Sequence, residues 1–164
     1  LANSFGLGYE QEFKEFPSLA IGAYGDNLLN ITNAYSAINN NGKIQSPEII
    51  EKIESFKKQP IWENKSISKK ILDLKINKKI NKLLEKSVKE GTSKAASIKG
   101  KKIYGKTGTS DGNKDLWFIG SIDNLTTGIW IGYDDNKESE LSSGNAAYLW
   151  KKFISEIYKI PIKK

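Results

Sequence analysis

The 164-residue sequence contains no cysteine, histidine, arginine or methionine, and only four prolines. Without cysteine it can form neither disulfides nor thiol nucleophiles nor zinc–thiolate clusters. Without histidine it also lacks the commonest general base and metal ligand. Any chemistry must therefore use serine, threonine, lysine, tyrosine and carboxylates, and we expect neither a metal nor a cofactor.

Long apolar runs are also missing. No stretch approaches the roughly 18 consecutive apolar residues of a membrane-spanning helix. The first ten residues lack the charged start and apolar middle of a signal peptide, and Leu1 is not an initiating methionine. We therefore expect the chain to begin inside a longer protein, with any membrane anchor or export signal upstream. Its own length fits a single domain, residues 1–164.

Lysine supplies all of the basic charge. The formal net charge is +7 and the isoelectric point is about 9.3. Such a balance suits an anionic partner such as nucleic acid, anionic lipid or an acidic wall polymer. Nucleic-acid readers usually favour arginine for bidentate contacts to phosphate and guanine, so the absence of arginine argues against nucleic acid. The lysine-rich stretch 57–106 is better explained as a solvated helix face.

The first two thirds of the sequence carry helical patterns. Residues 17–42 predict one amphipathic helix that ends at the Asn39–Gly42 cluster, because Asn and Gly tolerate the left-handed backbone of a helix end. Asn77 is predicted to cap a second helix that ends near Gly91. Its predicted apolar stripe is Ile80, Leu83, Leu84 and Val88. Between the two helices, residues 42–76 are predicted to be a connecting region.

The last third changes to a strand pattern. Strands are predicted at 103–104, 116–119 and 129–133, with turns at Asp111-Gly112-Asn113 and Asp123-Asn124. Short turns between consecutive strands predict an antiparallel meander. Apolar residues occupy both the odd and the even positions of the second and third strands, which predicts that helices cover both faces of the sheet. A final helix over 145–159 should pack on this sheet through a stripe at helical spacing: Ala146, Trp150, Phe153 and Ile157, widened by Ala147, Ile154 and Tyr158. The predicted fold class is α+β.

The stretch "GKTGTS" at 105–110 has three interpretations. With Gly100 it matches the spacing of a phosphate-binding Walker A loop, but a strand follows it where that loop requires a helix. It could also be an ordinary hairpin with a polar turn. Alternatively, Lys106 and the two threonine hydroxyls could line a strand edge that Gly108 keeps open. That arrangement suits a carboxylate-bearing peptide laid along the edge.

The surrounding sequence favours the third interpretation. Lys106-Thr107-Gly108-Thr109 resembles the third motif of penicillin-binding protein transpeptidase domains, and the closer resemblance is to the bifunctional class A enzymes. Residues 17–43 resemble the family's segment after its second motif, 90–110 its approach to the third, and 115–135 its two following strands. This chain would be the C-terminal portion of such a domain, with an antiparallel sheet flanked by helices.

The resemblance implies a set of roles. In the family, a serine attacks the D-alanyl-D-alanine bond of a peptidoglycan stem peptide, and β-lactams acylate the same serine. Lys106 would be catalytic and would supply positive charge near the substrate and the serine of the second motif. Thr107 and Thr109 would bind the substrate carboxylate, Thr109 most directly, and Gly108 would leave the strand surface open. The backbone N–H near Thr109 would be an oxyanion-hole donor. The parent would act in cell-wall synthesis at the outer face of the bacterial inner membrane, with a glycosyltransferase domain upstream.

The family's first two motifs, Ser-x-x-Lys and Ser-x-Asn, are not recognisable in a suitable position. The residues that begin at Ser55 and at Ser66 have the letters of the Ser-x-x-Lys motif, and those that begin at Ser143 have the letters of the Ser-x-Asn motif. Their order in the chain and their surroundings argue against a catalytic role. We therefore expect the chain to be inactive without the upstream part of its domain. Its expected partners are that upstream part, the stem peptide and β-lactam antibiotics, with membrane contact only through an upstream anchor.

Other features have plainer interpretations. The acidic side chains at 134, 135, 138 and 140 are predicted to be solvated after a strand. Trp117 and Trp130 are predicted to pack against the core or a helix, and Tyr104 to be a packing residue. Two alternatives stay open: a non-catalytic module of the same fold that binds wall peptide or a partner, and a basic nucleic-acid-binding domain.

Overall fold

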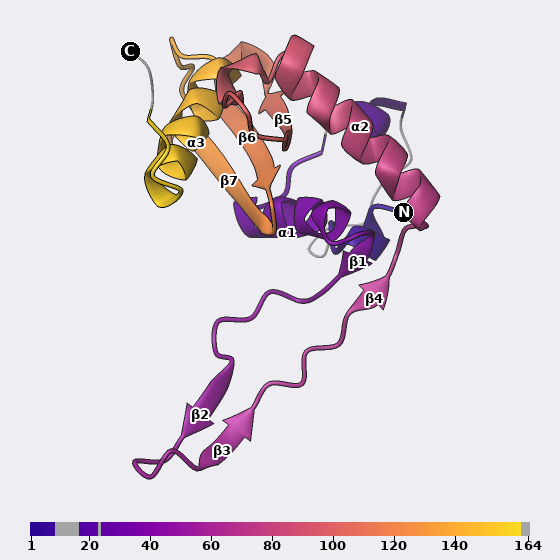
Figure 1. The fold of residues 1–164 in the computed structure, drawn as a ribbon. Coiled ribbons are helices and arrows are strands. Elements are labelled where there is room, and N and C mark those ends of the chain that lie inside the picture. Colours follow the sequence, from indigo (N-terminus) through magenta and orange to yellow (C-terminus); the bar gives the residue numbers. More distant parts are fainter. Residues whose placement is uncertain (9–16, 23, 162–164) are drawn as a thin grey trace.

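A computed structural model describes residues 1–8, 17–22 and 24–161 (Figure 1). Short 3₁₀ helices carry the label η. In chain order the elements are η1 (Asn3–Phe5), η2 (Pro17–Ile21), α1 (Leu28–Asn39), β1 (Lys43–Ile44), β2 (Lys52–Glu54), β3 (Pro60–Glu63), β4 (Lys69–Lys70), α2 (Leu74–Glu90), η3 (Lys94–Ala96), β5 (Ile103–Thr109), η4 (Asp111–Asn113), β6 (Asp115–Ile122), β7 (Leu125–Gly132) and α3 (Ser143–Ile157).

The predicted meander is confirmed. Strands β5, β6 and β7 form an antiparallel sheet in that order, and Gly105 lies opposite Gly120, which lies opposite Thr127. Helices cover both faces, because a Cβ added at Gly120 would lie 2.7 Å from Trp150 of α3, whereas one added at Gly128 would lie 2.2 Å from Thr32 of α1. Adjacent strand positions face opposite sides. The fold is therefore α+β, with a helix-flanked antiparallel sheet.

The main core lies between the sheet and α3. Trp150 is fully buried and its ring meets that of Phe118 edge to face, with centroids 5.3 Å apart. The predicted stripe of α3 is only partly correct, because Phe153 and Ile157 are 47% and 50% exposed. The face that carries Trp150 and Ile154 points to the sheet, and the flank that carries Phe153 and Ile157 turns away from it.

Helix α1 begins later than the sequence predicts. Asn27 caps it by accepting a hydrogen bond from the backbone N–H of Asn30 (2.8 Å), while Pro17–Ile21 forms the separate η2. Ala23, inside the predicted helix, lies outside the described residues. The predicted end is confirmed: the helix stops at Asn39, and positive φ values follow at Asn41 and Gly42. The predicted start is wrong because Pro17 and the small residues after it do not belong to α1.

Helix α2 corrects the predicted role of Asn77. The helix begins at Leu74, one turn earlier, and Asn77 is buried with its Nδ2 donating to the carbonyl of Ile38 at 2.9 Å. Asn77 therefore binds α2 to the end of α1 and does not cap a helix. In the predicted apolar stripe, Val88 is buried, but Leu83 is 68% exposed.

Glu85 connects α2 to the segment that precedes β5. Its carboxylate lies 2.8 Å from Lys89 Nζ and 3.7 Å from Lys102 Nζ. The hydrogen bond from Lys89 is the main cause that holds the pKa of Glu85 below its usual value, and the charge of Lys102 acts in the same direction. The carboxylate of Glu85 therefore stays ionised to a lower pH than that of an unpaired glutamate.

The predicted connecting region forms an extended arm, residues 45–69. Figure 1 shows it projecting from the body as two antiparallel segments. Strands β1 and β4 pair at its base, and β2 and β3 pair near its end with Ile53 opposite Trp62. In the described residues, no helix is long and apolar enough to cross a bilayer.

Candidate functional site

Strand β5 presents the Lys-Thr-Gly-Thr stretch at an edge of the sheet. It pairs with β6 on one side, and no strand within the described ranges pairs with the other. Lys106 and Thr109 are exposed, and the Lys106 ammonium donates to the carbonyl of Thr107 at 2.7 Å. The strand thus offers a cation, a hydroxyl and unpaired backbone groups along one margin.

Thr107 lies on the face of this strand opposite Lys106 and Gly108, the same face as Thr109. Its side chain is 7% exposed, and its hydroxyl is 2.7 Å from the hydroxyl of Thr92, which follows α2. The two threonines tie the middle of β5 to the end of α2. The predicted contact of Thr107 with a substrate carboxylate stays a prediction; in this structure its hydroxyl is engaged with Thr92.

Removing this tie tests whether it positions β5. Thr92→Val should lower the free energy of unfolding by about 1–2 kcal/mol, because the buried hydroxyl of Thr107 loses its partner. Thr92→Ser keeps a hydroxyl and should cost clearly less. Urea denaturation followed by tryptophan fluorescence measures both. A valine variant as stable as the original chain would show that the contact does not hold β5.

Two glycines allow close packing along β5. A Cβ at Gly105 would lie 2.5 Å from Phe118 Cζ, inside the core, so any side chain there would displace the buried ring. A Cβ at Gly108 would lie 3.2 Å from Trp117 Cβ, on the face that Gly108 shares with Lys106. A side chain at Gly108 would therefore crowd Trp117, and the substrate-binding role expected of Gly108 stays a prediction.

The turn after Thr109 is held by residues that the sequence motifs do not single out. Asp115 accepts hydrogen bonds from the hydroxyl of Ser110 (3.0 Å) and from Nε1 of Trp130 (2.9 Å), and its backbone N–H donates to Ser110 Oγ (2.8 Å). Gly112 within the turn has a φ of 69°. In the sequence, this network is indicated only by a serine and an aspartate on either side of the predicted turn. This network fixes the end of β5.

The two predicted packing tryptophans lie at the surface. Trp117 is half-buried, Trp130 is 37% exposed, and their ring centroids are 6.5 Å apart. They pack on each other beside Gly108, so the predicted core position is wrong for Trp130. Tyr104 is half-buried and lies under the ammonium of Lys102, 5.7 Å from the ring centroid.

The other serines of interest lie away from β5. Ser55 and Ser66 are on the arm, where Ser55 accepts a hydrogen bond from the Gln59 backbone and Ser66 one from Gln45. Ser143 is the first residue of α3. Asp135 pairs with Lys137, and the described side chains include no group of three or more acidic, histidine or cysteine residues that could hold a metal ion.

A polar hollow of about 400 Å³ lies at the end of the sheet remote from Thr109. Its lining comes from the end of α1, from β1 and the start of the arm, and from the β6–β7 turn: Ser36, Asn39, Asn40, Lys43, Gln45, Asn124, Leu125 and Thr126. Lys106 and Thr109 do not line it. The residues of the predicted site thus lie on β5, away from this hollow.

Comparisons with known proteins all point to one family. A family model of the penicillin binding protein transpeptidase domain matches residues 7–152. The chain is 30% identical over 143 residues to Penicillin-binding protein 4 of Bacillus subtilis (strain 168), covering 85% of this chain and 23% of that protein. It is 35% identical over 155 residues to Penicillin-binding protein 1A of Rickettsia typhi (strain ATCC VR-144 / Wilmington), covering 80% and 20%. The chain thus spans about a fifth of the length of these relatives.

Solved structures share the fold. Penicillin-binding protein 1A from Haemophilus influenzae superposes with a TM-score of 0.79 at 22% identity, over 99% of this chain and 31% of that one. Penicillin-binding protein A from M. tuberculosis, solved as an imipenem acyl-enzyme complex, gives 0.73 at 17% identity, over 94% and 40%. With the match over residues 7–152, these findings confirm the resemblance seen around Lys106: the chain belongs to the penicillin-binding protein transpeptidase domain family, with class A-like relatives.

Proposed function

We propose that the chain is the C-terminal part of a serine-type peptidoglycan D,D-transpeptidase domain and carries the substrate-binding edge of its active site. The observation that carries the proposal is the exposure of Lys106 and Thr109 on the open margin of β5, within the motif that the family match includes. A stem peptide would lie along this margin as an added strand, held by backbone hydrogen bonds.

Each residue of the strand then has a distinct task. The Lys106 ammonium attracts the anionic end of the substrate, and the Thr109 hydroxyl donates to the terminal carboxylate. Gly108 leaves room for the peptide backbone. Thr107, bonded to Thr92, fixes the strand from behind. The Thr109 backbone N–H polarises the scissile carbonyl, and such a donor contributes about 100- to 1,000-fold in comparable sites.

The bond-breaking serine would come from upstream sequence. Its Oγ attacks the D-alanyl-D-alanine carbonyl, D-alanine leaves with a proton, and an amine of a neighbouring stem peptide takes the acyl group from the serine. β-Lactams would acylate the same oxygen. The proposed site of action is the outer face of the bacterial inner membrane, with a glycosyltransferase domain further upstream in the parent. No nucleic acid takes part.

Two surfaces support an incomplete domain. The outer edge of β7 has no strand partner in the described part of the chain, and its eight residues include no charge and no proline that would protect a free edge. The exposed flank of α3 carries Leu149, Phe153 and Ile157 at helical spacing, each about half exposed. Both surfaces suit coverage by further elements of the same domain.

Labelling with a fluorescent penicillin tests the proposal. The longer protein that contains this chain should form a covalent adduct stable in denaturing gels, and the 164-residue chain should form none. A well-folded parent with an intact Ser-x-x-Lys serine that takes no label would overturn the transpeptidase proposal and favour a non-catalytic module of the same fold. Label on the isolated chain would place the nucleophile within these residues.

A further inference from the structure

The arm exposes a set of large apolar side chains that the body does not cover. A two-stranded ribbon is marginally stable alone in water, so apolar groups on it call for an explanation. Phe56, at the turn, is fully exposed, and Ile61 is 68% exposed. The exposed members are Ile49, Ile50, Ile53, Phe56, Ile61, Trp62 and Ile67. Four of them, Ile53, Phe56, Ile61 and Trp62, belong to the hairpin of β2 and β3, which lies at the end of the arm farthest from the body (Figure 1).

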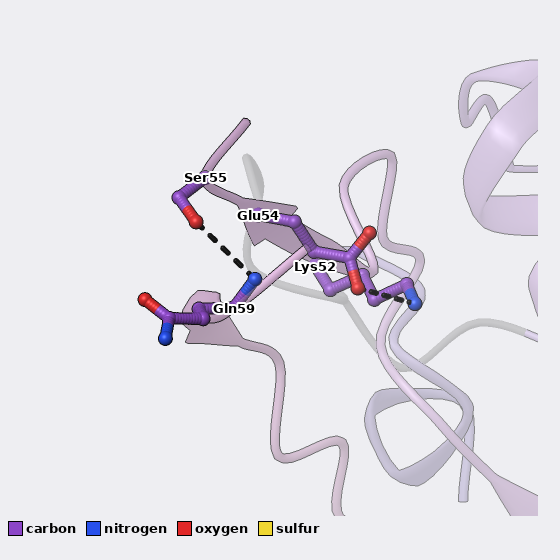
Figure 2. Close-up of polar contacts among 4 residues, drawn as sticks. All are labelled: Lys52, Glu54, Ser55 and Gln59. Atoms are coloured by element: carbon purple, nitrogen blue, oxygen red, sulfur yellow. Dashed lines mark hydrogen bonds and ion pairs between the residues drawn. The ribbon is translucent and has the colours of Figure 1, made fainter. Parts of the chain in front are cut away.

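Two lysines without an ion pair lie at the turn of the same hairpin, which Glu51 and Glu63 flank on the side of the body. Lys52 forms an ion pair with Glu54 at 3.0 Å, so these two charges largely cancel (Figure 2). Lys57 and Lys58, in the turn itself, are exposed and have no ion pair among the described residues. The apex therefore combines two unpaired ammonium groups with the exposed ring of Phe56. We call residues 52–62 the tip.

Three backbone N–H groups of the turn donate hydrogen bonds within it. The Ser55 N–H donates to the Gln59 carbonyl and the Lys58 N–H to the Ser55 carbonyl, both at 2.9 Å. The Gln59 N–H donates to the Ser55 hydroxyl at 3.2 Å, as Figure 2 shows. Because these donors already have partners, the turn can enter a region with little water without stranding them.

We propose that the tip is a membrane-contact element that inserts into the headgroup region of an anionic lipid leaflet. Phe56, Ile61 and Trp62 enter the boundary between headgroups and acyl chains, where aromatic and apolar side chains on a basic element bind. Lys57 and Lys58 bind the lipid phosphates. The net charge of +7 adds long-range attraction to such a surface. This contact adds to the upstream anchor expected from the sequence and does not depend on the transpeptidase chemistry.

The shape and composition of the tip favour lipid over a protein partner. A stable protein interface buries about 800 Å² on each side, and a narrow ribbon of about ten residues offers little of the flat area required. Lysine is also depleted in protein interfaces, whereas it is enriched beside aromatic residues on elements that lie in membrane interfaces. An anionic wall polymer would engage the lysines alone and leave the apolar side chains uncovered.

Vesicle sedimentation with the full 164-residue chain tests the proposal. The chain should bind vesicles of phosphatidylglycerol and phosphatidylethanolamine, bind pure phosphatidylcholine vesicles far more weakly, and lose affinity as salt rises. Lys57→Gln with Lys58→Gln should weaken binding about 30-fold, since each lysine near an anionic surface contributes about fivefold. Phe56→Ser should weaken it by about tenfold or more. Phe56 is fully exposed and Lys57 and Lys58 are exposed in the turn, so the variants should keep the fold.

Matched variants separate the tip from the rest of the basic surface. Lys78→Gln with Lys79→Gln removes the same charge from exposed positions on α2, and Leu83→Ser removes an equally exposed apolar group. Both should leave vesicle binding within about threefold. Brominated lipids should quench the original chain more than Trp62→Phe, because Trp62 lies in the bilayer interface. The proposal is overturned by no vesicle binding, by equal losses in tip and α2 variants, or by quenching that Trp62→Phe does not reduce.

Discussion

Replacing Lys106 by alanine in the longer protein is expected to slow covalent labelling by fluorescent penicillin by about 100-fold or more. The Lys106 ammonium lies on the open margin of β5, and it donates to the neutral carbonyl of Thr107. Its charge is thus available to a substrate carboxylate. Losing one partner of a desolvated charge pair costs about 2–5 kcal/mol, which corresponds to factors of about 30 to several thousand. The measurement is the second-order rate constant of acylation.

Two variants make the result specific to this position. Lys99→Ala removes the same charge from an exposed residue outside β5 and should leave the rate within about threefold. Lys106→Arg keeps the charge but replaces a compact ammonium by a planar group, so an intermediate rate is expected. Equal rates for Lys106→Ala and Lys99→Ala would contradict the role proposed for Lys106. Covalent labelling of both variants would still show that the upstream serine is reactive.

The sequence predicted the elements whose signals are local. The turn at Asp111-Gly112-Asn113 and the apolar run 116–119 define a hairpin within about twenty residues, and the structure has β5 and β6 on either side of that turn. The end of α1 was predicted because left-handed backbone at Asn41 and Gly42 depends on residue type alone. The motif that begins at Lys106 is likewise a local signal, because its four residues are consecutive in the sequence.

Features that depend on distant contacts were missed. Asn77 has the composition of a cap, but its amide is used to reach Ile38, 39 residues earlier. Thr107 and Thr109 are the same residue type two positions apart, yet only Thr107 meets a hydroxyl from another element, Thr92. The arm was not predicted as a hairpin because Pro60 reads as a break, whereas it begins β3 beside a register shift near Glu54.

Trp150→Ala should destabilise the chain by about 3–5 kcal/mol, more than the loss of the Thr92 hydroxyl. The ring is fully buried, packs edge to face on Phe118, and fills the space above Gly120. Its removal leaves a cavity that the rigid sheet cannot close. The free energy of unfolding from urea titration measures the effect. A loss below about 1 kcal/mol would show that the helix–sheet core is not packed as described.

Phe153→Ala, one turn along the same helix, tests whether further elements of the domain cover the exposed flank of α3. In the 164-residue chain Phe153 is 47% exposed, so its truncation should cost less than about 1 kcal/mol. If upstream elements cover this flank in the longer protein, as proposed, the same substitution there should cost about 3 kcal/mol, because it then opens a buried cavity. Trp150→Ala should cost the same in both contexts. An equally mild effect of Phe153→Ala in both would mean that nothing packs on α3, and the domain would have to be completed elsewhere, starting from the free edge of β7.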